Sequence, residues 1–202
     1  MIWRKRILFV LCLGPLLWVV SKVSSDSFGP DPGKSLVLFS GEWGLIFLLL
    51  ALLVSPLKRW TGLSEVLRYR RMLGLYAFFY ASIHLTAVFT YLLGWSVRIL
   101  IEEFSERPYM ALGILAWVVM LPLAATSSNF MLRRLNKYWK KLHQSVYLIA
   151  VLVCAHYIWL VRSDYLEAFI YSALIGLLLV ERLVLKTRKR SFLFLDRLRS
   201  EQ

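Results

Sequence analysis

Long apolar runs constrain this chain more than any other feature. The run "VYLIAVLVCAHYIWLV", residues 146–161, is typical, because it has no formally charged residue and a single histidine. A helix that crosses a bilayer core of about 30 Å needs about 20 such residues, and only a helix satisfies its own backbone hydrogen bonds within one run. We therefore predict transmembrane helices at about 7–23, 43–57, 72–94, 109–125, 142–162 and 165–185.

These segments predict an all-α fold, a six-helix transmembrane bundle that forms a single domain over residues 1–202. The chain is 59% hydrophobic, with a mean hydropathy of +0.62, whereas a soluble domain is about 45–50% apolar. Cys12 and Cys154 lie inside apolar runs and not in a C-x-x-C motif, so we interpret them as small buried side chains. The sequence shows no nucleotide-binding glycine motif and no internal repeat.

The basic residues predict the orientation of the bundle. The net charge is +13, but these charges lie between apolar runs, which argues against a nucleic-acid partner and for the positive-inside rule. If the N-terminus is inside, only five of the 25 Lys and Arg residues fall in the outer segments: Lys22, Lys34, Arg98, Arg107 and Arg162. We therefore expect both termini to be cytoplasmic.

The first apolar run could instead be a signal peptide, because "RKR" precedes "ILFVLCLGPLLWVV". No A-x-A cleavage site follows it, so we favour a retained helix. The orientation of the other five helices is the same in either case.

Two histidines are predicted to lie at the same depth in the membrane. His84 is 12 residues, or about 18 Å, from the inner start of its helix, and His156 is 14 residues, or about 21 Å, from the start of its own. Ionisable groups inside membrane helices are costly and mark functional sites. Each could be a neutral imidazole bonded to a neighbouring carbonyl, but a pair at one depth can also hold a planar metal cofactor.

Imidazole is a common axial ligand of haem iron, so we expect His84 and His156 to bind a haem. Aromatic side chains, which would suit a porphyrin or serve only for packing, follow the same two helices: Phe78, Phe79, Tyr80, Phe89, Tyr147, Tyr157 and Trp159. Zinc is a weaker alternative, since Cys154 is the one further ligand near this depth. A proton relay would need acidic groups, and only Glu42 and Glu181 lie at the edges of the helices.

A second, weaker cofactor site is expected at the inner edge, around His143 and Arg70. Arg70 shares a helix face with His84 if that helix extends far enough, whereas His143 lies about 140° from the face of His156 on an ideal helix. A bend or an irregular start to the fifth helix would be needed to point both His143 and His156 at one partner. The cations here would suit haem propionates, although His143 could also be a headgroup-level polar residue.

The outer loops offer few candidates. "SSDSFGPDPGK", residues 24–34, reads as a turn-rich loop, and "RILIEEFSERP", residues 98–108, as a short interfacial helix. Four outer acidic residues could help to dock a partner, although a solvated loop is the simpler interpretation: Glu102, Glu103, Glu106 and Asp164.

The chain resembles the ferric-reductase-like transmembrane haem proteins, and among them the haem-binding membrane subunits of periplasmic methionine sulfoxide reductase systems. The clearest stretches are "YRRMLGLYAFFYASIHL", "ERPYMALGILAWVVMLPLAATS" and "WKKLHQSVYLIAVLVCAHYIW". The resemblance implies that His84 and His156 bind haem b, that His143 matches a third histidine of the family, and that Arg70 matches an arginine which serves a second haem. Wider members carry two histidines on each ligand helix, and Arg70 stands where one of these four would be.

The resemblance also implies partners. Electrons would come from the quinone pool or a cytosolic flavin reductase, and pass through haem b and an associated FMN. The acceptor would be a periplasmic molybdopterin-dependent catalytic subunit that reduces methionine sulfoxide in oxidised proteins, so the chain itself would not carry out that chemistry. A stand-alone ferric or quinol-linked reductase is the alternative, and a transporter or scaffold without redox chemistry is a third possibility.

Overall fold

The computed structural model describes residues 2–25, 27–161 and 165–200, which form helices joined by short turns and contain no strand. The all-α class is therefore confirmed. Six helices are long and apolar enough to cross a membrane. In chain order the elements are α1 (Ile2–Ser24), α2 (Pro32–Thr61), η1 (Ser64–Arg68), α3 (Arg70–Ala87), the π-helical η2 (Val88–Leu92), α4 (Val97–Glu106), α5 (Pro108–Ala125), α6 (Asn129–Leu135), α7 (Lys137–Leu142), η3 (His143–Ser145), α8 (Val146–Leu160) and α9 (Tyr165–Ser200).

The second helix is much longer than its apolar run suggested. It begins at Pro32, inside the stretch predicted to be a loop, and ends at Thr61. Pro32 occupies the first turn, where its missing N–H costs nothing, and the Asp31 carboxylate accepts a hydrogen bond of 2.9 Å from the Lys34 amide. Gly62 closes the helix in the left-handed conformation, with φ of 73°. Capping signals, not hydrophobicity, therefore set both ends of α2.

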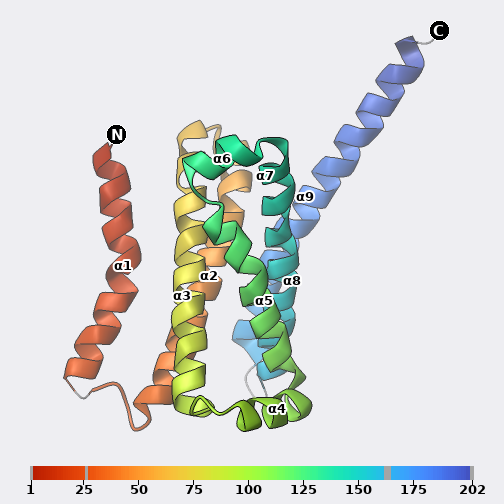
Figure 1. Cartoon of the computed structure of the whole chain (residues 1–202). Coiled ribbons are helices and arrows are strands. Elements are labelled where there is room, and N and C mark those ends of the chain that lie inside the picture. Colours follow the sequence, from red (N-terminus) through yellow and green to blue (C-terminus); the bar gives the residue numbers. More distant parts are fainter. Residues whose placement is uncertain (1, 26, 162–164, 201–202) are drawn as a thin grey trace.

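The long helices alternate in direction (Figure 1). α1, α3 and α8 run away from the end that carries α6 and α7, and α2, α5 and α9 run back towards it. The helices α2 and α3 pack against each other along their length, and so do α5 and α8. These two antiparallel pairs form the centre of the bundle. Residues 109 and 156 thus come to lie at the same level as residues 37 and 84.

An aromatic core fixes α3 against α2. The Phe47 ring on α2 lies 5.4 Å from that of Tyr76 and 5.2 Å from that of Tyr80 on α3, both stacked. Gly44 allows close approach as well, because a Cβ atom there would lie 3.4 Å from the Ala81 amide nitrogen. Cys12 is buried and Cys154 half-buried, and neither forms a disulfide. Tyr76, Tyr80 and His84 lie on one face of α3, and the stacking on Phe47 directs that face at α2 and the bundle interior.

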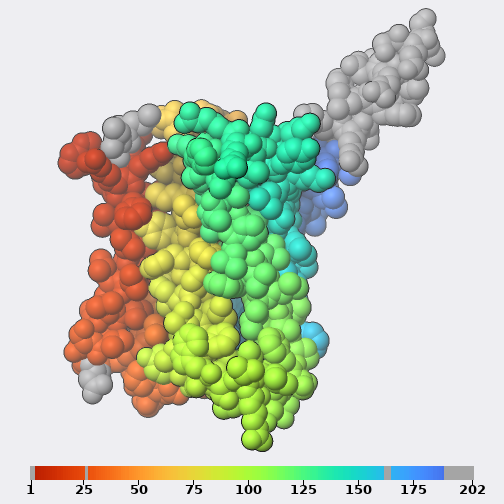
Figure 2. Space-filling model, viewed as in Figure 1, coloured from red at the N-terminus to blue at the C-terminus, as the bar shows by residue number. Residues whose placement is uncertain are grey.

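The two ends of the molecule differ in charge. α4 and its neighbours close one end, and α6 and α7 cover the other (Figure 2). The α6–α7 end carries the predicted cytoplasmic cations, including Arg133, Arg134, Lys140 and Lys141. Arg162 and the side chains beyond Arg188 lie outside the described residues. Which end faces the cytoplasm stays a prediction from this charge difference.

Candidate haem site and inner cavity

The imidazoles of His84, on α3, and His156, on α8, lie next to each other inside the bundle. Their ring centroids are 6.4 Å apart, and the ring planes make an angle of 83°. The equal depths calculated from the sequence therefore correspond to a real juxtaposition of the two side chains.

Each imidazole is held through one nitrogen. His84 Nδ1 lies 2.8 Å from the Val37 carbonyl oxygen on α2, and His156 Nδ1 lies 2.7 Å from the Tyr109 carbonyl oxygen on α5. A carbonyl oxygen only accepts, so Nδ1 carries the proton and the Nε2 lone pair is left available. A histidine that served only for packing could make the same contact. However, metal-bound histidines are characteristically oriented in this way by their second nitrogen.

The spacing of the rings fits a metal ion bound between them. An imidazole nitrogen binds such an ion at about 2.0–2.1 Å and the ring centroid lies roughly 1.1 Å behind it, so two axial imidazoles have centroids about 6.3 Å apart. The observed 6.4 Å matches that value. Imidazole nitrogens suit iron, so these two residues would serve as ligands of a haem iron.

Two glycines lie directly against the histidines, and the sequence reading did not single them out. A Cβ atom on Gly41 would lie 2.9 Å from His84 Nδ1, and one on Gly113 would lie 2.9 Å from His156 Nδ1. Such distances are shorter than real Cβ contacts. Gly41 precedes the predicted run 43–57 and Gly113 lies near the start of the run 109–125, so neither stands out by its position.

A cavity of about 180 Å³ lies nearer the α6–α7 end, between α3, α5, α7, α8 and α9. Its lining contains several cations and no acidic residue: Arg70, Arg71, Lys140 and Arg182, with His143, Gln144 and Tyr147 as the other large polar groups. The Arg182 guanidinium lies 4.6 Å from the centre of the Tyr147 ring. The excess of positive charge suits an anionic ligand.

His143 faces this cavity because the fifth membrane segment starts irregularly. The 3-10 turn η3 (His143–Ser145) separates α7 from α8, which supplies the irregularity that the helical-wheel angle required. The imidazole stacks on Trp139 with 3.8 Å between centroids, and His143 Nδ1 lies 3.1 Å from the Trp139 carbonyl oxygen. His143 Nε2 and the Tyr147 hydroxyl are buried without a hydrogen-bond partner among the described residues. Both atoms could therefore bind a ligand in the cavity.

Arg70 and Arg71 both line the cavity, although the sequence reading named only Arg70. Arg70 is the first residue of α3, so the helix extends far enough for it to share a face with His84. The Arg71 guanidinium donates to the Ser127 carbonyl oxygen and to Asn129 Oδ1, the latter at 2.7 Å. Arg71 thereby fixes the connection between α5 and α6, which forms one wall of the cavity.

Comparison with known proteins identifies the family to which the chain is related. The family described as "Ferric reductase like transmembrane component" matches residues 40–154, which include Gly41, His84, Gly113 and His143. The "Protein-methionine-sulfoxide reductase heme-binding subunit MsrQ" of Xanthomonas euvesicatoria pv. vesicatoria (strain 85-10) is 42% identical over 170 residues, covering 84% of this chain and 78% of that protein. The protein of the same name from Xanthomonas campestris pv. campestris (strain 8004) is 43% identical over 171 residues, with the same coverage. This chain belongs to the MsrQ family. No solved structure matches it significantly.

The aromatic residues predicted around the ligands do not form a single wall in this MsrQ-family chain. Phe78 and Tyr147 line the inner cavity. Phe79 and Trp159 are 37% and 59% exposed and face outwards. Tyr80 and Tyr157 pack away from the site, against Phe47 and Tyr171 respectively, and Phe89 packs on Trp95 at the α4 end. Most of this set therefore serves packing and interface contacts.

The alternatives of zinc and of a proton relay gain no support. Among the described residues, no three His, Cys, Asp or Glu side chains lie together in a way that could hold a metal ion. Glu181 forms an ion pair of 2.8 Å with Arg59, and Glu42 accepts a hydrogen bond of 3.4 Å from the Tyr171 hydroxyl. Both carboxylates therefore have partners other than the histidines.

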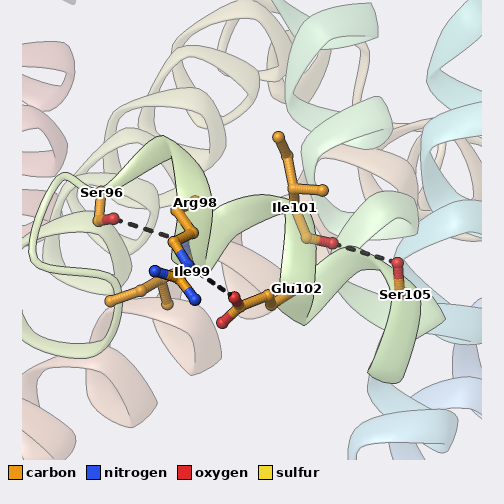
Figure 3. A network of polar contacts seen from close by, with 6 residues as sticks. All are labelled: Ser96, Arg98, Ile99, Ile101, Glu102 and Ser105. Atoms are coloured by element: carbon orange, nitrogen blue, oxygen red, sulfur yellow. Dashed lines mark hydrogen bonds and ion pairs between the residues drawn. The ribbon is translucent and has the colours of Figure 1, made fainter.

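The acidic residues at the opposite end are largely paired within the chain. α4 is helical, as predicted, and Ser96 caps its first turn through a 3.4 Å contact to the Ile99 amide (Figure 3). Arg98 Nε lies 3.0 Å from Glu102 Oε1, and Arg107 Nε lies 3.1 Å from Glu103 Oε2. Asp164 lies outside the described residues. Two of the suggested docking residues thus already have a cationic neighbour on their own helix or directly after it.

Proposed function

We propose that this protein is a haem b membrane electron-transfer subunit. The observation that carries the proposal is the imidazole pair: the centroids of His84 and His156 are 6.4 Å apart, and each Nδ1 is engaged by a carbonyl so that Nε2 is available. The relatives' name, haem-binding subunit, supports the same assignment.

Haem bound here would supply a one-electron couple between ferric and ferrous iron. The protein's own residues would do the rest. His84 and His156 would hold the iron from two helices, and their bonds to Val37 and Tyr109 would keep both rings in place during the change of charge. Burial would keep water from the iron and favour electron transfer over ligand exchange.

The charge difference between the two ends supports an orientation in the membrane. We propose that the cationic α6–α7 end faces the cytoplasm and that electrons enter there, from the quinone pool or a cytosolic flavin reductase. They would leave at the α4 end, which would face the periplasm of a bacterial inner membrane. His156 follows His143 by thirteen positions, about 20 Å along a helix, so a cofactor in the inner cavity would lie between the donor and the haem.

The inner cavity, with a volume of about 180 Å³, would hold the anionic end of that entry cofactor. Arg70, Arg71, Lys140 and Arg182 would neutralise an anionic group, and His143 Nε2 and the Tyr147 hydroxyl would complete the site. Its charge fits either the phosphate of FMN or the propionates of a second haem. Extraction of the purified protein separates these two, since FMN would be released as a fluorescent flavin and haem would raise the haem-to-protein ratio.

The acceptor would be a partner subunit. The relatives are named as subunits of a protein-methionine-sulfoxide reductase. We propose that this chain pairs with a periplasmic molybdopterin-dependent catalytic subunit as a heterodimer, and that the partner reduces methionine sulfoxide in oxidised proteins.

The decisive experiment is a reduced-minus-oxidised absorption spectrum of the purified protein, with haem quantified, beside His84→Ala and His156→Ala variants. We expect a b-type spectrum, and we expect both substitutions to abolish the contribution of the haem held by His84 and His156. Trp159→Leu, at a 59% exposed position on the same helix as His156, is the control and should keep it. A well-folded wild-type protein without haem would end the electron-transfer proposal. Rapid reduction of a soluble ferric chelate by protein supplied with an electron donor but with no periplasmic subunit would instead favour a stand-alone reductase.

A further inference from the structure

The two histidines belong to two copies of one three-part arrangement. In α2 and α3 it consists of the Val37 carbonyl, Gly41 and His84. In α5 and α8 it consists of the Tyr109 carbonyl, Gly113 and His156. In both copies the histidine follows its carbonyl partner by 47 residues, and the glycine follows that carbonyl by four. This repeat was missed in the sequence because it lies in the spacing of three residues and not in the surrounding letters.

The glycine has a specific place in this arrangement. In an α-helix the carbonyl of residue i accepts from the amide of residue i+4, so the second lone pair is the one that remains for an outside donor. The side chain of residue i+4 points towards the N-terminus and covers that carbonyl. A glycine at i+4 leaves the carbonyl open to the imidazole of the neighbouring helix.

The distances show how little room there is. A Cβ atom on Gly41 would lie 2.9 Å from His84 Nδ1 and 3.0 Å from its Cε1. One on Gly113 would lie 2.9 Å from both the Cε1 and Nδ1 atoms of His156. In each case the imidazole could give way only by moving off its carbonyl, which would also turn Nε2.

We infer that Gly41 and Gly113 are positioning residues, which set the orientation of the two imidazoles towards the iron. This inference rests on the proposed haem function. It assigns to the glycines the near-perpendicular setting of the rings, 83°. The orientation and hydrogen bonding of the ligands tune a bound iron, so a displaced ring would alter the EPR signal and the midpoint potential of a haem held here as well as the affinity for haem.

Other glycines of the chain supply matched controls. A Cβ atom on Gly33, also in α2, would lie 2.6 Å from the Tyr91 ring, so alanine there would clash with a tyrosine and not with a histidine. A Cβ atom on Gly176, in α9, would meet nothing within 4 Å. The first control measures the effect of overpacking as such, and the second that of a helical glycine replaced by alanine.

The experiment compares wild-type protein with Gly41→Ala, Gly113→Ala, Gly33→Ala and Gly176→Ala, each purified whole in detergent. We expect the haem affinity of Gly41→Ala and Gly113→Ala to fall on the order of ten-fold, with a shifted EPR signal and midpoint potential in any haem retained. Gly33→Ala and Gly176→Ala should keep the wild-type EPR signal and potential. Wild-type haem content, EPR signal and potential in both Gly41→Ala and Gly113→Ala would overturn the inference.

A second readout does not need haem. In apoprotein, Gly41→Ala should lower the melting temperature when His84 is present but have little effect beside His84→Ala, because the imidazole that it strikes is then absent. The same cycle applies to Gly113 and His156. An equal loss in both backgrounds would overturn the inference even if haem binds normally. A haem-free wild type that still shows this coupling would instead overturn the proposed function, because the glycines would then orient histidines that bind no haem.

Discussion

The Tyr80 hydroxyl donates a hydrogen bond of 2.9 Å to the Cys12 carbonyl oxygen and thereby joins α3 to α1. The same hydroxyl accepts a hydrogen bond of 3.2 Å from the Leu16 amide. In a regular helix that amide would bond to the Cys12 carbonyl, so the tyrosine is inserted into this step of the α1 hydrogen-bond ladder, directly after Pro15. Because Tyr80 precedes His84 by one turn, the first helix is tied to a candidate ligand helix.

Tyr80→Phe should therefore destabilise the protein. It removes the hydrogen bond that joins α3 to α1, while the Leu16 amide is free to bond to the Cys12 carbonyl as in a regular helix. The expected loss is therefore that of one intramolecular hydrogen bond, about 0.5–1.5 kcal/mol. Thermal unfolding in detergent measures the loss. Tyr91→Phe, at a 58% exposed position, is the control and should change stability by less than about 0.5 kcal/mol. Equal stability of the two variants would mean that the α1 contact contributes nothing.

His143→Ala should separate the two cofactor sites. The imidazole of His143 faces the inner cavity and not the His84–His156 pair. We expect the b-type spectrum of the central haem to persist, while the cofactor of the inner cavity is lost. Measuring haem per protein and released flavin in the same sample checks this. Loss of the central spectrum would show instead that His143 is a ligand of that haem.

Arg182→Met should weaken the binding of an anionic cofactor without emptying the central site. The substitution preserves much of the side-chain volume but removes a charge that lines the cavity beside Tyr147. A hydrogen bond to a charged group contributes about 1.5–3 kcal/mol, so affinity should fall roughly 10- to 100-fold. Titration of FMN into cofactor-depleted protein gives the value. Arg98→Met, at the α4 end, should leave it unchanged.

Glu102→Gln should have little effect. Its partner Arg98 is 88% exposed, and ion pairs at such positions contribute about 0–1 kcal/mol. We expect unchanged thermal stability and an unchanged rate of electron transfer to a catalytic partner. A marked fall in that rate at constant stability would assign Glu102 to the docking surface after all.

Hydrophobicity and helix geometry are enough to predict the six helices and the pairing of His84 with His156. The rise per residue turns a sequence position into a depth, and two equal depths in one bundle leave few other arrangements. The angle of about 140° between His143 and His156 on an ideal helix is informative in the same way. It indicated an irregular start to the fifth helix, and η3 is such an irregular turn. Each of these features depends on local periodicity alone.

Features that depend on which faces meet could not be predicted in this way. The start of α2 was placed too late because Asp31 and Pro32 define it while hydrophobicity does not. The aromatic residues were predicted as one group, but their helix faces distribute them between core, cavity and lipid. The contacts of Gly41 and Gly113 and the anchoring of Arg71 likewise depend on neighbours distant in the chain.

The division of the two histidines between the α2–α3 pair and the α5–α8 pair has a consequence for assembly. Each pair contributes one imidazole, so neither pair alone could hold a six-coordinate haem iron, and the proposed haem would bind only once both have met. By mass action, a ligand that binds only the assembled form stabilises that form. Haem supply would then limit how much of the chain reaches the assembled form.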